Sequence, residues 1–204
     1  MSEAYKRGSG KTFFELLSLG EWVQFQFQMA VRMERPSIHV TSFGRVPSSQ
    51  IIHESFGLIG LHANHAKPVI YTGNKVIPAP DALMIVNDIQ YAVEVKSKRV
   101  DPRYENVLLD RAEVDELRNS AEALGQEPVF VFYLTGVDEP HPEESIGDTE
   151  GMPNLCEFSV MNLKTIESYQ PAYIRGTEVY FIPTADLVSV DEWLEHEEPL
   201  VKKA

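Results

Sequence analysis

Cysteine is almost absent from the sequence: Cys156 is the only one among 204 residues. An intrachain disulfide is therefore impossible, and we expect the protein to work in a reducing compartment. The chain also has no apolar run that approaches membrane-spanning length, and its first residues lack the apolar segment of a signal peptide. We therefore expect a cytoplasmic protein that does not bind a membrane.

Positive charge is scarce as well, with 18 Lys and Arg residues against 31 Asp and Glu, a formal net charge of −13. Proteins that bind DNA tightly on their own usually carry a basic surface, so this composition argues against such a protein. Residues 1–136 hold 14 basic and 16 acidic residues, whereas residues 137–204 hold 4 and 15. We predict a single domain over residues 1–204, with an acidic loop at 137–154 and an acidic C-terminal tail.

The sequence lacks a complete signature for a bound nucleotide or zinc ion. Residues 10–12 (Gly-Lys-Thr) match the end of a phosphate-binding loop, but Tyr5 stands where that loop needs a glycine. The histidines at 53, 62 and 65 follow no zinc-binding spacing, and no cysteine lies near them. A small-molecule enzyme of α/β type is therefore only a weak alternative.

The most informative stretch runs from residue 80 to residue 100. Both of its arms are rich in strand-forming residues, and the Asn-Asp pair at 87–88 favours a turn, so we predict a β-hairpin. That turn places Asp81 opposite Glu94. Because side chains alternate along a strand, Lys96 shares the face of Glu94. Two carboxylates and one ammonium group then converge, and a shift of one residue in the register would separate them.

These groups are those that metal-assisted hydrolysis of a phosphodiester needs. Mg²⁺ prefers oxygen ligands, and Asp81, Glu94 and the backbone carbonyl of Val95 can supply them. Lys96 can hold the attacking water or offset the charge that builds on the phosphate. An amphipathic hairpin with a surface Glu–Lys pair has the same pattern, so that alternative stays open at this point.

The Pro-Asp pair at 80–81, followed after twelve residues by Glu94-x-Lys96, resembles the PD-(D/E)xK nuclease superfamily. The resemblance covers about residues 20–135, and over residues 94–133 it looks most like archaeal Holliday-junction resolvases and restriction enzymes. It implies an α/β fold with a restriction-endonuclease-like core, in which helices flank a central mixed β-sheet. It also implies an endonuclease that cleaves DNA with Mg²⁺ or Mn²⁺, with Asp81, Glu94 and Lys96 as its catalytic residues.

The segments on either side of the hairpin agree with that order of elements. Capping boxes and apolar spacing predict helices at residues 12–33 and 108–125, and residues 128–134 read as a buried strand. The superfamily often carries a further metal-binding carboxylate on the helix before the hairpin. The resemblance therefore makes Glu21 a fourth candidate catalytic residue, although a helix-capping role explains it almost as well.

Basic residues gather just past the motif, and we predict that Lys98, Arg99 and Arg103 bind the substrate. A solvated strand end explains the same residues about equally well. A catalytic chain this acidic should need a protein partner or a homo-oligomer to hold DNA. The main alternative is a catalytically inactive scaffold of the same fold in a larger DNA-processing or defence complex, against which the intact Asp, Glu and Lys argue.

Overall fold

The structure is a computed structural model that describes residues 13–42, 69–72, 75–136 and 154–195. The three histidines considered above lie outside the described residues, as do the C-terminal tail and residues 137–153 of the acidic loop. None of the helices in the described part of the chain is long and apolar enough to cross a membrane.

The predicted hairpin forms, and its register is the predicted one. Strands β4 (Ala82–Val86) and β5 (Ile89–Val100) pair antiparallel, with Ala82 opposite Val93 at the open end. Asn87 and Asp88 have φ angles of 49° and 65°. Both central residues of a type I′ turn adopt this left-handed conformation, and Asn and Asp tolerate it better than other non-glycine residues.

Strand β5 lies at the centre of a six-stranded sheet with the order β1-β4-β5-β7-β8-β11. It runs parallel to β7 (Glu127–Gly136), while every other pair in the sheet is antiparallel. The other strands are β1 (His39–Ser42), β8 (Phe158–Asn162) and β11 (Val188–Ser189). The predicted central mixed sheet with flanking helices is therefore confirmed.

One face of this sheet is covered by α1 (Phe13–Glu34) and α5 (Val190–Glu195). Strand β5 buries Tyr91, Val93 and Val95 on this side. The rings of Tyr91 and Trp193 meet edge to face at 5.0 Å, which ties α5 to the sheet. Because Tyr91, Val93 and Val95 point toward α1 and α5, the even-numbered residues of β5 between and after them point to the opposite face of the sheet.

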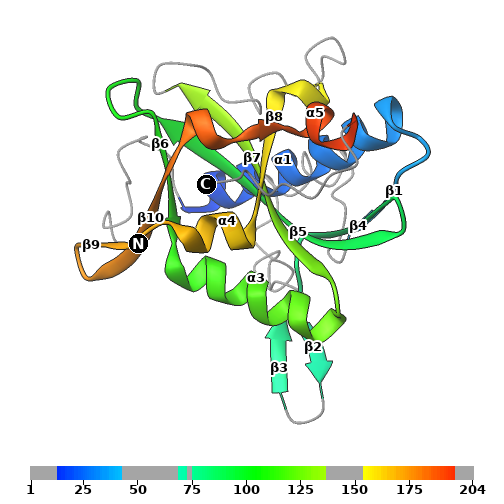
Figure 1. Ribbon diagram of the computed structural model, residues 1–204, viewed down its shortest axis with the longest axis horizontal. Helices are drawn as coiled ribbons and strands as arrows, with labels where there is room; N and C mark the ends of the chain where they lie inside the picture. Colours follow the sequence, from blue (N-terminus) through cyan, green and yellow to red (C-terminus); the bar gives the residue numbers. More distant parts are fainter. Residues whose placement is uncertain (1–12, 43–68, 73–74, 137–153, 196–204) are drawn as a thin grey trace.

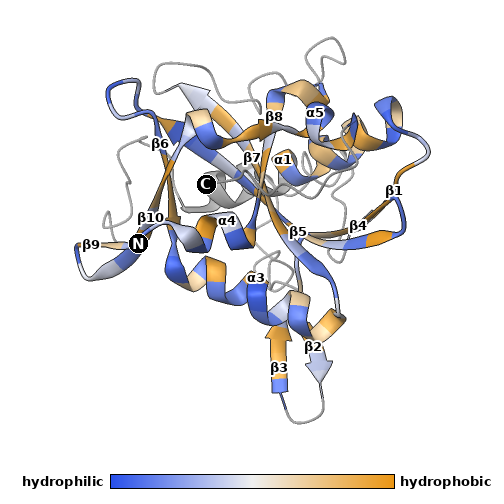
Figure 2. Ribbon diagram, viewed as in Figure 1, coloured by the Kyte–Doolittle hydropathy of each residue, from blue (hydrophilic) through white to orange (hydrophobic). Residues whose placement is uncertain are grey.

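The opposite face is covered by α3 (Arg111–Leu124), α4 (Leu163–Ser168) and a second, three-stranded sheet. That sheet has the order β6-β10-β9 and consists of β6 (Asn106–Asp110), β10 (Thr177–Pro183) and β9 (Ala172–Ile174). Figure 2 shows hydrophobic and hydrophilic residues along α3, whose residues Val114, Leu117 and Ala121 are buried. Short 3₁₀ turns occur at Leu155–Glu157 and Thr184–Asp186.

The helix predicted at residues 108–125 begins later than expected. Residues 108–110 belong to β6, and the helix begins at Arg111. Val107 and Leu109 are fully buried while Leu108 is 46% exposed, which is the two-residue period of a strand and not the period of a helix. The end of the helix is as predicted, since Gly125 adopts the left-handed C-cap conformation with φ 68°.

A small hairpin of β2 (Val69–Thr72) and β3 (Lys75–Pro78) projects from the body beside α3 (Figure 1). The Ser120 hydroxyl of α3 donates a hydrogen bond to the carbonyl of Pro78. Only Ala79 and Pro80 separate β3 from Asp81, so this bond helps to fix the chain that leads into the motif.

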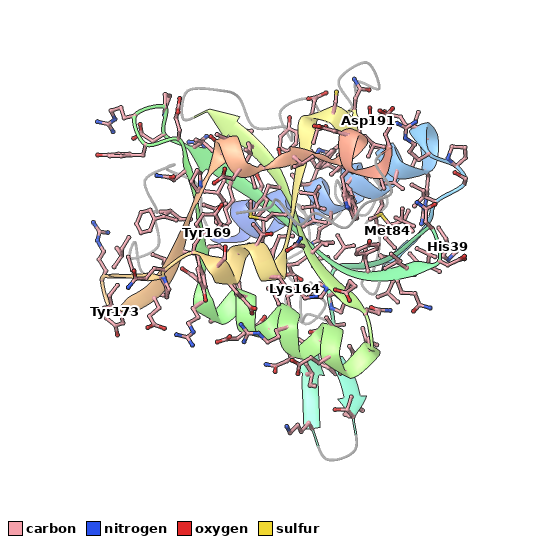
Figure 3. All side chains as sticks on the ribbon, in the orientation of Figure 1. His39, Met84, Lys164, Tyr169, Tyr173 and Asp191 are labelled. Carbon is pink, nitrogen blue, oxygen red and sulfur yellow. The ribbon has the colours of Figure 1, made fainter. Side chains whose placement is uncertain are left out.

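At another edge of the molecule, the Tyr173 side chain extends outward from β9 (Figure 3) and is 73% exposed.

The turn conformation predicts the effect of changing Asp88, which is exposed. Asp88→Val should lower the free energy of unfolding by about 1–2 kcal/mol, because a β-branched residue is strained at positive φ. Asp88→Gly should leave stability unchanged or slightly higher, because glycine adopts this conformation without strain. Urea unfolding of the two variants and the parent measures this. Equal stability of the valine variant and the parent would contradict the type I′ turn.

Candidate active site

The candidate site lies where β4 begins and β5 extends past it. The pairing of β4 with β5 starts at Ala82 and Val93, whereas β5 stays paired with β7 as far as Val100. Next to this point the Val95 N–H donates a hydrogen bond of 2.8 Å to Asp81 Oδ2. Because the N–H and C=O of a strand residue point to the same side, the Val95 carbonyl also faces the Asp81 side of β5.

Glu94 and Lys96 lie on the face of β5 that is covered by α3. Ala92, two residues before Glu94, belongs to the core on that side, and the alternation of side chains carries the next two even-numbered residues to the same face. Lys96 Nζ lies 3.1 Å from Glu94 Oε1, and Glu94 is only 5% exposed. The structure thus brings together the three residues that the sequence predicts as a cluster.

The carboxylates around Lys96 keep it charged. Burial alone lowers the pKa of this lysine, but the negative charges of Glu94, Glu113 and Asp81 outweigh the burial and raise the pKa above its usual value. Lys96 is therefore an ammonium group at neutral pH. It can donate hydrogen bonds to water or to a phosphate oxygen.

Glu113 belongs to this cluster, and the sequence analysis missed it. Its Oε1 lies 3.0 Å from Lys96 Nζ and its Oε2 lies 3.5 Å from Lys98 Nζ. Oε2 also accepts a hydrogen bond of 3.2 Å from the backbone N–H of Asp110. The sequence does contain a capping-box spacing, Asp110-x-x-Glu113, which marks a helix that begins at Arg111. The predicted helix began at residue 108 instead, so Glu113 was not placed in its first turn.

Glu113 is ionised in this setting. Burial raises the pKa of its carboxyl group, but the charges of Lys96 and Lys98 and the hydrogen bonds it accepts bring the pKa below the usual value. Burial has the larger effect on Lys98, whose pKa is lowered despite the nearby Glu113. The ion pairs of Lys96 and Lys98 with Glu113 link β5 to the first turn of α3.

The other residues predicted to bind substrate lie outside this cluster. Arg99 is exposed, and it follows Lys98 on β5, so it projects to the other face of the strand. Arg103 lies in the loop after β5, where its guanidinium pairs with Asp101 through contacts of 3.0 Å and 2.6 Å and lies 5.5 Å from the ring centre of Tyr104. Its charge is balanced locally, which weakens its attraction for a phosphate.

Two predictions about the site remain untested. Glu21 lies within α1, but its side chain is outside the described part of the structure. Among the described residues, no group of three or more His, Cys, Asp or Glu side chains is arranged to hold a metal ion. The predicted ligands are two carboxylates and one carbonyl, so the metal site stays a prediction.

No protein-family model matches the chain, and no curated protein matches it in sequence. Among solved structures, the chain is similar to Hjc, a Holliday junction resolvase from Archaeoglobus fulgidus, an archaeal hyperthermophile. The two are 13% identical with a TM-score of 0.44, and the match covers 84% of this chain and 98% of Hjc.

The hydrogen bond from Val95 predicts how substitutions of Asp81 affect stability. Asp81→Ala leaves the N–H of Val95, a residue only 3% exposed, without this acceptor and should cost about 1–3 kcal/mol. Asp81→Asn keeps an acceptor oxygen, and the relief of repulsion from Glu94 offsets the lost attraction to Lys96, so its stability should stay within about 0.5 kcal/mol of the parent. Thermal and urea unfolding measure both. Equal losses in the two variants would show that the negative charge, and not the hydrogen bond, supports the fold.

Proposed function

We propose that the chain is a nuclease that hydrolyses phosphodiester bonds of DNA with the help of Mg²⁺ or Mn²⁺, as an endonuclease. The observation that carries the proposal is the ammonium group of Lys96, held against Glu94 beside the Asp81 carboxylate at the open end of one hairpin. The same three residues form the motif that resembles the PD-(D/E)xK superfamily.

The donor atoms in this cluster fit a hard divalent cation. Asp81, Glu94 and the Val95 carbonyl would hold the ion, and all three offer oxygen. With the charge of Lys96 included, the two carboxylates leave one net negative charge, which favours a cation. When bound, the metal would make water a better nucleophile and would neutralise charge on the phosphate.

The chain's own residues then have separate roles. Glu94 holds Lys96 in place, and Lys96 donates hydrogen bonds to the attacking water or to the phosphate oxygen on which charge builds. Asp81 accepts a hydrogen bond from the Val95 N–H and so fixes this edge of β5. The Val95 carbonyl faces the same side. Lys98, and Arg99 outside the cluster, would contact the DNA backbone.

DNA is the proposed substrate although the net charge is −13. A partner protein or a second copy of the chain would supply the missing affinity, since phosphate binding depends on basic surface. An inactive scaffold of the same fold remains the competing function. The two differ in a single observable, which is cleavage that depends on Lys96.

Lys96→Ala should lower the rate of cleavage by about 10²-fold or more, as the loss of other electrostatic stabilisers does. DNA affinity should change much less, because the interaction is made mainly in the transition state. Lys98→Ala should mainly weaken DNA binding. Lys164→Ala, at a lysine on α4 whose side chain is 81% exposed, is the control and should match the parent. Single-turnover cleavage and equilibrium binding, measured separately, distinguish these effects.

Two outcomes would count against the assignment. If Lys96→Ala cleaves as fast as the parent, Lys96 is not part of the catalytic machinery. If the parent cleaves no linear, supercoiled, single-stranded or branched DNA in Mg²⁺ or Mn²⁺, the scaffold function is favoured.

The proposed metal ligands predict weak metal binding in the absence of DNA, because two carboxylates and one carbonyl leave several water molecules on the ion. Glu94→Gln should weaken Mn²⁺ binding further, whereas Glu122→Gln, which removes an exposed carboxylate of α3, should not. Titration calorimetry and the electron paramagnetic resonance of Mn²⁺ measure this. Mn²⁺ binding that is unaffected by substitution of both Asp81 and Glu94 would place the ion elsewhere.

A further inference from the structure

We propose that Glu113 is a positioning residue that holds the Lys96 ammonium group in place for the reaction. This inference rests on the proposed nuclease function. Lys96 is held by carboxylates from two directions: Glu94 lies on its own strand, with Oε1 at 3.1 Å, and Glu113 reaches it from α3, with Oε1 at 3.0 Å.

The second contact matters because a lysine side chain is long and flexible. A single carboxylate two residues away on the same strand restrains the ammonium group from one side only. Glu113 restrains it from the helix, so that the ammonium group is fixed between two elements of the fold. Reaction rates are sensitive to such placement, and a misplacement of about 1 Å can cost 10²-fold in rate.

The contact is also sheltered from solvent. The side chains of Lys96 and Glu113 are 21% and 28% exposed. Ion pairs at fully exposed positions are screened by water and salt and hold their partners weakly. A partly buried pair keeps more of its attraction, and the Lys98 contact on the other oxygen of Glu113 further restrains the carboxylate.

The fold fixes the position of Glu113 itself. Its Oε2 accepts the Asp110 N–H, and Asp110 is the last residue of β6, opposite Val179 of β10. The next residue, Arg111, pairs with Glu178 at 2.7 Å. Together these contacts set the first turn of α3 against the second sheet. The position of Glu113 on α3 is therefore fixed, and its side chain reaches Lys96 from that position.

A helix-capping role alone would not need the charge of Glu113. Glutamine at the third position of a helix also forms the capping box, because its side-chain oxygen accepts the same backbone N–H. Glu113→Gln therefore keeps the cap and removes the ionic contacts with Lys96 and Lys98. This substitution separates the positioning role from a purely structural one.

In the cleavage assay, Glu113→Gln should lower kcat by about 10- to 100-fold and change KM by less than about 3-fold. Glu122→Gln removes a carboxylate from the same helix at an exposed position and should leave kcat and KM at the parent values. Circular dichroism and the melting temperature verify that both variants fold. A kcat for Glu113→Gln equal to that of the parent overturns the proposal, and so does a variant that fails to fold, because glutamine keeps the cap.

A second measurement does not depend on activity. The ¹⁵N relaxation of the Lys96 ammonium group, assigned with the help of Lys96→Arg, should show restricted motion in the parent and in Glu122→Gln. In Glu113→Gln the motion should increase. If the parent cleaves no DNA, the proposed function fails while this measurement still decides whether Glu113 positions Lys96. Unchanged motion in Glu113→Gln overturns the positioning role even if the parent is an active nuclease.

Discussion

The charge of Lys96 is the constraint on which the site depends. A partly buried ammonium group is costly unless carboxylates surround it, and here they come from three parts of the fold. Asp81 comes from the segment before β4, Glu94 from β5 itself and Glu113 from the first turn of α3. The hairpin register, the extension of β5 past β4 and the start of α3 must all be correct for these charges to meet. The geometry of the site therefore depends on how β4, β5 and α3 pack together.

The balance of charge in the cluster bears on how it would receive a phosphate in the proposed reaction. Asp81, Glu94 and Glu113 carry three negative charges against the two positive charges of Lys96 and Lys98. Without a metal ion the cluster is net negative and repels a phosphate. In the proposed reaction, a divalent cation held at Asp81 and Glu94 would offset this negative charge and would favour the approach of a phosphate.

The part of the site that could be predicted from sequence is the part that is local. Asp81 and Glu94 are thirteen positions apart and joined by one turn, so side-chain alternation and the Asn87–Asp88 pair were enough to place them together. Glu113 could not be placed in this way, because its contact depends on how α3 packs against β5. The second sheet was missed for the same reason, since residues 106–110 pair with β10, which begins at Thr177. Arg103, which the sequence predicts to bind substrate, pairs with the neighbouring Asp101, and its role in substrate binding stays a prediction.

We propose that this chain cleaves DNA with a metal ion held at Asp81 and Glu94. The most direct test is a cleavage assay on supercoiled and branched DNA with the parent and Glu94→Gln proteins, purified side by side, in Mn²⁺ and in EDTA. We expect products only with the parent protein and only in Mn²⁺. Cleavage by Glu94→Gln at the rate of the parent would contradict this proposal, and so would the absence of any product with the parent protein.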